Sequence, residues 1–303
     1  MEKEIYQRAV AHKPQFKVGD YEHFNVEPLS GALGAEIHGL DIATNLSDPS
    51  VASELRQALS NHLVLIFRDQ HLGMEKFRLF GQLFGQLQMN PAVIKQGDAG
   101  DVMLVRQEAD EHYNFSGNWH SDVSWAPRPA GETALYAIEI PPCGGDTHFA
   151  NTILAFETLP DEMKKRLIGL RSIHQLERSQ REFAVKKTAD ADASAEQSSV
   201  LLAEHPVVRR HPVTGASTLF VSEQFTLRFA GMTEEESTPL LQQLFQHQTR
   251  PDFTCRIRWK KGTLAIWDNR ATIHYASNDY PYFRREMMRV STVGEVPLAT
   301  KSD

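Results

Sequence analysis

Short apolar runs, each closed by glycine, proline or charged residues, are the feature that most constrains what this chain can fold into. Such a run is too short for a stable helix and, between turn-forming residues, is typical of a buried strand. The runs and the turns between them predict strands within residues 63–67, 133–140, 147–150, 219–221 and 263–267, and the clean alternation of residues 255–259 predicts another. Apolar residues at helical spacing predict a few helices, near Asp48, Phe77, Asp161 and Thr233. The pattern favours a mainly β protein with flanking helices around a double-stranded β-helix core of the jelly-roll, cupin-like kind.

Nothing in the sequence divides the chain, which has neither an internal repeat nor a linker-like segment. Its 303 residues are 41% apolar and 23% charged, as in globular domains, and β-rich barrels often reach this size as one unit. We therefore expect a single domain over residues 1–303. Residues 179–199 are rich in small and polar side chains that bury little apolar area, so they predict a mobile insertion. A lid over a site and a plain disordered insertion both fit this composition.

The charge balance and the apolar pattern exclude two classes of partner. The formal net charge of -7 argues against a nucleic-acid binder, which needs a basic face. No apolar run reaches the ~20 residues that a membrane-spanning helix requires, and the N-terminus lacks the apolar segment of a secretory signal. Cys143 and Cys255 have no metal-type spacing, so we expect two reduced thiols. These features predict a cytoplasmic protein, and we also expect a homo-oligomer.

The stretch Asn-Trp-His-Ser-Asp at 118–122 carries the first sign of chemistry. If it is extended, His120 and Asp122 point to the same side and can reach one ion together. Two histidines and one carboxylate on one face form a mononuclear non-haem Fe(II) site, so this stretch would supply two of the three ligands. The pair alone is weak evidence, because a histidine beside an aspartate is more often an ordinary hydrogen-bonded pair.

The C-terminal part of the chain offers a third ligand and two candidate anion-binding groups. His274 follows a predicted strand and the turn-like Asp-Asn-Arg at 268–270. Arg285 and Arg289 are four residues apart, so on one strand they share a face, and a guanidinium binds carboxylates bidentately. The alternative is that Arg284, Arg285 and Arg289 form a solvated edge, and without further context the residues slightly favour that edge. The poorly patterned residues 86–117 before the His-Ser-Asp stretch fit a specificity loop or a plain surface excursion.

Four motifs in the same order and spacing make the chain resemble the TauD/TfdA family of Fe(II)- and 2-oxoglutarate-dependent dioxygenases. They are Asn-Trp-His-Ser-Asp at 118–122, Pro-Pro-Cys-Gly-Gly-Asp-Thr at 141–147, His-Pro-Val-Thr-Gly at 211–215, and Trp-Asp-Asn-Arg at 267–270, which His274 and the arginines follow. Each motif alone is modest, but together they are specific. The resemblance covers nearly the whole chain and implies the jelly-roll fold and the cofactors Fe(II), 2-oxoglutarate and O2.

The resemblance also assigns the residues of the reaction centre. It implies that His120, Asp122 and His274 are the catalytic iron ligands. An arginine eleven residues after the last histidine binds the distal carboxylate of 2-oxoglutarate in the family, and this spacing falls on Arg285. A threonine after the Gly-Gly-Asp turn assists it, and that position is Thr147.

The substrate positions depart from the pattern of the taurine-specific members. Arg289 stands where the family places an arginine on the acidic group of the substrate, so the resemblance implies a small anionic organic substrate. A histidine, a tyrosine and an asparagine of the taurine-specific members align by eye with Asn90, Val93 and Ser116. The loss of an imidazole and a phenol argues against taurine and favours a bulkier or more apolar acid.

The expected function is therefore hydroxylation of a sulfonate, a sulfate ester, or an aryloxy or aliphatic carboxylate, with succinate and CO2 as co-products. If the hydroxylated carbon bears a heteroatom leaving group, the product collapses to an aldehyde or ketone and the free anion. One alternative is a biosynthetic hydroxylase of an amino-acid-like substrate, with Arg289 on its carboxylate. A second is a non-catalytic jelly-roll binding protein, against which the complete ligand set argues.

Overall fold

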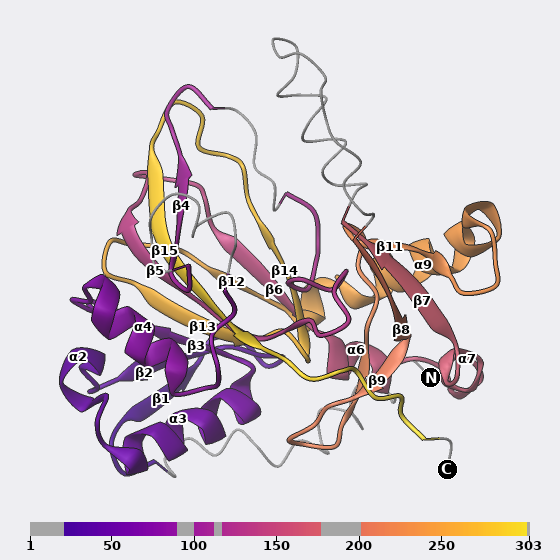
Figure 1. Cartoon of the computed structure of the whole chain (residues 1–303), viewed down its shortest axis with the longest axis horizontal. Helices are drawn as coiled ribbons and strands as arrows, with labels where there is room; N and C mark the ends of the chain where they lie inside the picture. The colour runs from indigo at the N-terminus through magenta and orange to yellow at the C-terminus, as the bar shows by residue number, and fades with distance from the viewer. Residues whose placement is uncertain (1–20, 90–99, 112–116, 177–200, 302–303) are drawn as a thin grey trace.

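The computed structural model describes residues 21–89, 100–111, 117–176 and 201–301 (Figure 1). The strands are β1 (Asn25–Pro28), β2 (Ala35–His38), β3 (Val64–Phe67), β4 (Met103–Gln107), β5 (Ala130–Glu139), β6 (Thr147–Asn151), β7 (Arg171–Gln175), β8 (Leu202–Pro206), β9 (Val208–Arg210), β10 (Ser217–Leu219), β11 (Thr226–Phe229), β12 (Thr254–Ile257), β13 (Leu264–Asp268), β14 (Thr272–Ala276) and β15 (Arg285–Val293). The helices are α2 (Ile42–Asn45), α3 (Pro49–His62), α4 (Met74–Gln82), α6 (Thr152–Glu157), α7 (Asp161–Leu167), α9 (Glu234–Gln248) and the short 3-10 helix η1 (Pro251–Phe253). The insertion predicted at 179–199 lies outside the described residues.

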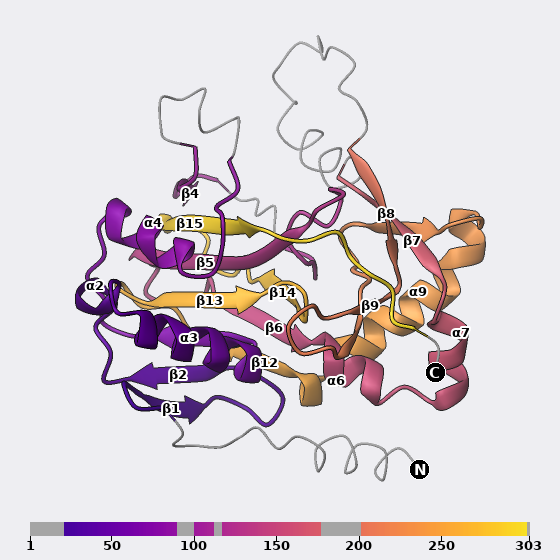
Figure 2. The ribbon, with the colours of Figure 1, turned by 60° about the horizontal axis from the view of Figure 1, so that its bottom comes forward.

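Two sheets packed face to face form the jelly roll that the sequence predicted. The larger has seven strands in the order β1-β2-β3-β13-β5-β15-β4, and the smaller has the order β12-β6-β14. Among the described strands only β2 and β3 pair in parallel. A further sheet, β11-β7-β8, lies with the β9–β10 hairpin and helices α6, α7 and α9 on the other side of the molecule (Figure 2). The site described below takes residues from β14 of the small sheet, from β15 of the large sheet and from the segment before β5.

Strand β3 shows why a predicted strand can be apolar at every position. Leu65 and Phe67 face one core cluster, which they share with helices α3 and α4. Val64 and Ile66 face a second cluster between the two sheets. Because helices cover the outer face of the large sheet and the small sheet covers its inner face, both sets of side chains are buried.

The helix boundaries follow capping signals in the sequence. The Asp48 side chain accepts a hydrogen bond from the Ser50 N–H at the start of α3, and Leu63 ends this helix in a left-handed conformation. Helix α9 begins with the capping box predicted at Thr233 and Glu236. The helix predicted from Asp161 is shorter than its apolar pattern suggests, because it ends at Leu167 before a glycine at positive φ.

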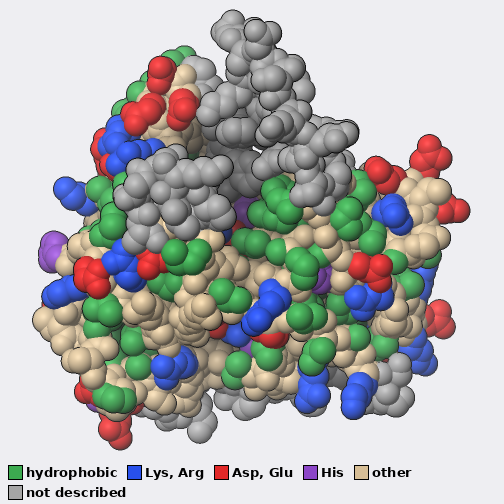
Figure 3. All heavy atoms as spheres, viewed as in Figure 1, with side chains coloured by type: hydrophobic (Ala, Val, Ile, Leu, Met, Phe, Trp, Pro, Cys, Tyr) green, Lys and Arg blue, Asp and Glu red, His purple; other side chains and the backbone are tan. Residues whose placement is uncertain are grey.

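The surface seen in Figure 3 and the described helices add two observations. On the face seen in Figure 3, acidic and basic side chains are interspersed and form no broad basic surface. Within the described parts of the chain, no helix combines the length and the apolar character needed to cross a bilayer.

Candidate metal centre

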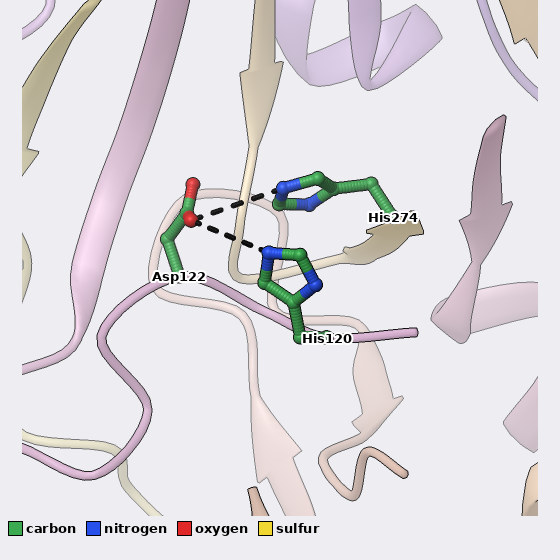
Figure 4. Close-up of side chains that lie close together, drawn as sticks. All are labelled: His120, Asp122 and His274. Carbon is green, nitrogen blue, oxygen red and sulfur yellow. Dashed lines mark ion pairs between the residues drawn. The ribbon is translucent and has the colours of Figure 1, made fainter. Parts of the chain in front are cut away.

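His120 and His274 are brought together by a pair of backbone hydrogen bonds. The N–H of His120 donates to the carbonyl of His274 at 2.9 Å, and the N–H of His274 donates to the carbonyl of His120 at 2.7 Å. Residues that exchange both bonds in an antiparallel bridge carry their side chains on the same face. The two imidazole rings therefore lie side by side, with centroids 4.2 Å apart (Figure 4). His274 comes from β14 of the small sheet, whereas His120 belongs to the segment that leads into β5.

Asp122 completes the group, although not in the way the sequence suggested. The chain leaves the bridge after His120 and enters a turn, so the segment is not a strand at Asp122. Nevertheless, Asp122 Oδ1 lies 3.8 Å from Nε2 of His120 and 3.8 Å from Nε2 of His274. All three side chains are buried, and a ligand atom of each lies within 4.8 Å of the others. Figure 4 shows the carboxylate facing both rings.

The protonation states suit a metal ion. His120 Nδ1 lies 2.8 Å from the carbonyl of Asn118, to which it must donate, so Nε2 of the neutral ring keeps its lone pair toward the site. Burial lowers the pKa of both histidines and keeps them neutral. Burial opposes ionisation of Asp122, but the charge of Arg289, whose Nη2 is 2.6 Å from Oδ1, favours it, and the pKa of this carboxylate lies below its usual range. Two imidazoles and one carboxylate are the donor set of a facial Fe(II) site.

Arg285 is a buried cation at the start of β15. Its side chain is 7% exposed, and its Nε and Nη2 atoms have no hydrogen-bond partner among the described residues. Burial lowers the pKa of its guanidinium. The Gly144-Gly145 turn packs closely here, since a Cβ added to Gly145 would lie 3.4 Å from Arg285 Nε. A buried guanidinium with unused donors is suited to an anionic ligand, so this position fits the distal carboxylate of 2-oxoglutarate.

Thr147 follows this glycine turn at the start of β6 and is buried. Its Oγ1 accepts a hydrogen bond from Trp259 Nε1 at 2.9 Å. Because a hydroxyl has one donor and two acceptor positions, the proton of Thr147 is left for another acceptor. The turn thus places a hydroxyl in the same region of the molecule as the Arg285 guanidinium.

Arg289 lies four residues further along β15, on the same face as Arg285. Its Nη2 is 2.6 Å from Asp122 Oδ1, and its side chain is 22% exposed. Arg284 is one residue before Arg285, so its side chain lies on the opposite side of the chain. There it forms ion pairs with Glu108, Glu139 and Glu286. The solvated-edge interpretation is therefore right for Arg284 and wrong for Arg285.

The surroundings of the centre include aromatic residues that the sequence pattern did not identify. Phe225, just before β11, contacts His120 edge-on with ring centroids 5.7 Å apart. Trp119 packs on Tyr275, with ring centroids 5.4 Å apart. The predicted substrate positions Asn90, Val93 and Ser116 lie outside the described residues.

Comparisons with known proteins agree with this geometry. The chain matches the model of the family described as Taurine catabolism dioxygenase TauD, TfdA family over residues 25–291. It is 34% identical to an alkylsulfatase of Acinetobacter baylyi, over 91% of this chain and 86% of the relative. It is 33% identical to an alpha-ketoglutarate-dependent sulfate ester dioxygenase of Pseudomonas putida, over 90% of this chain and 91% of the relative. The crystal structure of a taurine dioxygenase from Burkholderia xenovorans superposes with a TM-score of 0.77, at 34% identity, and covers 93% of this chain and 96% of that one.

The jelly roll and its two-histidine, one-carboxylate centre define the class of non-haem Fe(II) oxygenases. Within this class the chain belongs to the TauD/TfdA family. It is a 2-oxoglutarate-dependent dioxygenase that uses Fe(II), 2-oxoglutarate and O2. The predicted fold class, reaction class and cofactors are thereby confirmed.

Proposed function

We propose that this dioxygenase hydroxylates a small organic anion and that an alkyl sulfate ester is its substrate. Two relatives that match over about nine-tenths of the chain are named for sulfate esters. The observation that carries the proposal is the position of Arg289, whose guanidinium reaches the metal-facing oxygen of Asp122 while part of its side chain is exposed. An anion bound to Arg289 would therefore lie beside the reaction centre.

In this proposal His120, Asp122 and His274 hold Fe(II). Their Nε2 and Oδ1 atoms face one another inside a buried centre. The Arg285 guanidinium and the Thr147 hydroxyl hold the distal carboxylate of 2-oxoglutarate, the first by charge and the second by a hydrogen bond. The protein thus needs no further cation to neutralise the co-substrate at that end.

Arg289 binds the anionic head of the substrate. One of its nitrogens contacts Asp122 in the structure, and a guanidinium has five N–H donors, so donors remain for a sulfate or carboxylate oxygen. Because Arg285 and Arg289 share one face of β15, the co-substrate and the substrate would meet the metal from the same strand. Phe225 adds an apolar wall beside His120.

The main task of the protein in this reaction is to position the substrate, because the cofactors supply the oxidation. When bound, Fe(II) with 2-oxoglutarate and O2 supplies the oxidant that hydroxylates a C–H bond, and 2-oxoglutarate ends as succinate and CO2. Arg289 orients the carbon next to the ester oxygen beside the buried ligand group of His120, Asp122 and His274. The hydroxylated carbon then bears both a hydroxyl and the sulfate oxygen. Its C–O bond to sulfate breaks, the electron pair leaves with sulfate, and loss of the hydroxyl proton gives an aldehyde.

A product assay tests the proposal and separates substrate classes. An alkyl sulfate should release inorganic sulfate and succinate together, an alkyl sulfonate would release sulfite, and a carboxylate would release neither sulfur anion. The proposal predicts that medium-chain alkyl sulfates give the highest succinate rate. Faster turnover of an amino-acid-like substrate, or of sulfonates, would contradict it. A homo-oligomeric state and a cytoplasmic location stay predictions, which sedimentation and cell fractionation would test.

A further inference from the structure

Asp122 is held differently from the two histidines. The backbones of His120 and His274 support each other through their bridge, whereas Asp122 lies in the turn beyond it. The next residue, Val123, has φ 57, a left-handed conformation that β-branched residues rarely adopt. A backbone in this state persists only when its surroundings hold it. The geometry of the carboxylate ligand must therefore come from contacts outside its own segment.

Asn269 provides two of these contacts from the turn between β13 and β14. Its Oδ1 accepts a hydrogen bond from the backbone N–H of Asp122 at 3.2 Å. Its backbone carbonyl accepts a hydrogen bond from Ser121 Oγ at 2.9 Å. Asn269 is 1% exposed, so water does not compete for these bonds.

The other groups of Asn269 attach it to the large sheet. Its backbone N–H donates to the carbonyl of Gly131 at 2.9 Å, and its Nδ2 donates to Thr133 Oγ1 at 2.9 Å. Oδ1 also accepts a bond from Trp267 Nε1 at 3.0 Å. The side chain is thus fixed by β5 and β13 before it contacts the ligand segment, and a fixed acceptor sets the position of the group that donates to it.

We propose that Asn269 is a positioning residue that fixes the carboxylate ligand Asp122 relative to the two histidines. It does not touch the metal; it acts through the side-chain hydroxyl of Ser121 and the backbone N–H of Asp122. Asn269 lies in the turn between β13 and β14, and His274 follows five residues later within β14, so this turn lies next to two of the ligands. This inference rests on the proposed metal-binding role of His120, Asp122 and His274.

The test measures Co(II) affinity of the full-length chain by titration and by its visible absorption spectrum. Asn269→Ala should weaken Co(II) binding about 10- to 100-fold, the usual effect of losing a group that orients a metal ligand, and should change the Co(II) spectrum. Asn151→Ala is the matched control, because Asn151 is equally buried and makes two side-chain hydrogen bonds, to Ala32 and Leu154, away from the ligands. The Asn151→Ala variant should lose about as much thermal stability as Asn269→Ala. Its Co(II) affinity should stay within about twofold of the wild type, because no metal ligand loses a supporting hydrogen bond.

Ser121→Ala gives a second, milder variant that removes only the bond to the Asn269 carbonyl. It should weaken Co(II) binding about fivefold, the equivalent of one neutral hydrogen bond of about 1 kcal/mol, and it decides the question if Asn269→Ala does not fold. Affinities in both variants equal to that of Asn151→Ala would overturn the role of Asn269 and leave the metal site intact. Co(II) binding that is the same in the wild type and in His120→Ala would instead overturn the metal site itself, and the positioning role with it.

Discussion

Replacing Arg285 with methionine should separate the stability of the protein from its affinity for 2-oxoglutarate. Arg285 is buried, and two of its nitrogens have no partner among the described residues. A buried cation without a partner disfavours the folded state, and methionine keeps much of the side-chain volume without the charge. Arg285→Met should therefore leave the metal-free protein at least as stable as the wild type. The same change removes the only charge assigned to the distal carboxylate.

The size of the binding effect follows from the burial of the pair. Removing one partner of a buried, hydrogen-bonded charge pair costs about 2–5 kcal/mol of binding free energy. At 1.4 kcal/mol for each factor of ten, this corresponds to about a 30- to 4,000-fold increase in the Kd for 2-oxoglutarate. The kcat at saturating 2-oxoglutarate should fall much less, because the lost contact is made equally in the ground state and the transition state.

Anaerobic calorimetric titration of 2-oxoglutarate into the metal-loaded protein measures this Kd, and chemical denaturation measures the stability. Arg284→Met is the matched control. Arg284 is the neighbouring arginine but contacts surface carboxylates, so its loss should change stability little and leave the Kd unchanged. An unchanged Kd in Arg285→Met, or an equal loss in both variants, would refute the assignment of Arg285.

The remaining predictions concern the ligands, the substrate arginine and pH. Asp122→Ala should abolish succinate formation, and full activity of this variant would show that the carboxylate is not a ligand. Arg289→Ala should cost about 2–3 kcal/mol of binding free energy for an alkyl sulfate, which raises its KM roughly 30- to 150-fold. The KM for 2-oxoglutarate should change far less in the same succinate assay. Burial lowers the pKa of His174 to about 3 and that of His205 to about 4 in the folded protein. At pH 5 both side chains are neutral in the folded protein and become protonated when it unfolds. Their contribution to the free energy of unfolding is therefore fully present above the unfolded pKa near 6.5 and is lost as the pH falls below that value. Denaturation at pH 5 and pH 7 should differ by about 3–4 kcal/mol from this pair, and His174→Phe should remove about half of that difference.

The sequence predicted the strands well because their signal is local. Both faces of β3 are buried, so every residue of Val64–Phe67 is apolar, and a short apolar run between turns identifies such a strand without knowledge of its neighbours. The caps at Asp48 and Thr233 were equally readable, because a capping side chain bonds to its own helix.

The arginines show the limit of this reasoning. Spacing alone places Arg285 and Arg289 on one face and Arg284 on the other. It does not tell which face is buried, because that depends on the glycine turn at 144–145 and on the carboxylates that approach from other strands.

The metal centre depends on contacts between distant segments, so the residues alone could not predict its geometry. His120 and His274 meet through a bridge between segments 154 residues apart in numbering, from 120 to 274. Asp122 was expected to face the metal because of strand alternation, but it does so from a turn that Asn269 supports. The sequence therefore predicted which residue types form the centre, but it did not predict that Asn269 holds the Asp122 segment in place.

The most direct test of the central claim is the stoichiometry of products from a medium-chain alkyl sulfate. In the presence of Fe(II), 2-oxoglutarate and O2, the wild-type protein should release inorganic sulfate and succinate in equal amounts, and Asp122→Ala should release neither. Sulfate release that continues without 2-oxoglutarate, or that survives in Asp122→Ala, would contradict the account.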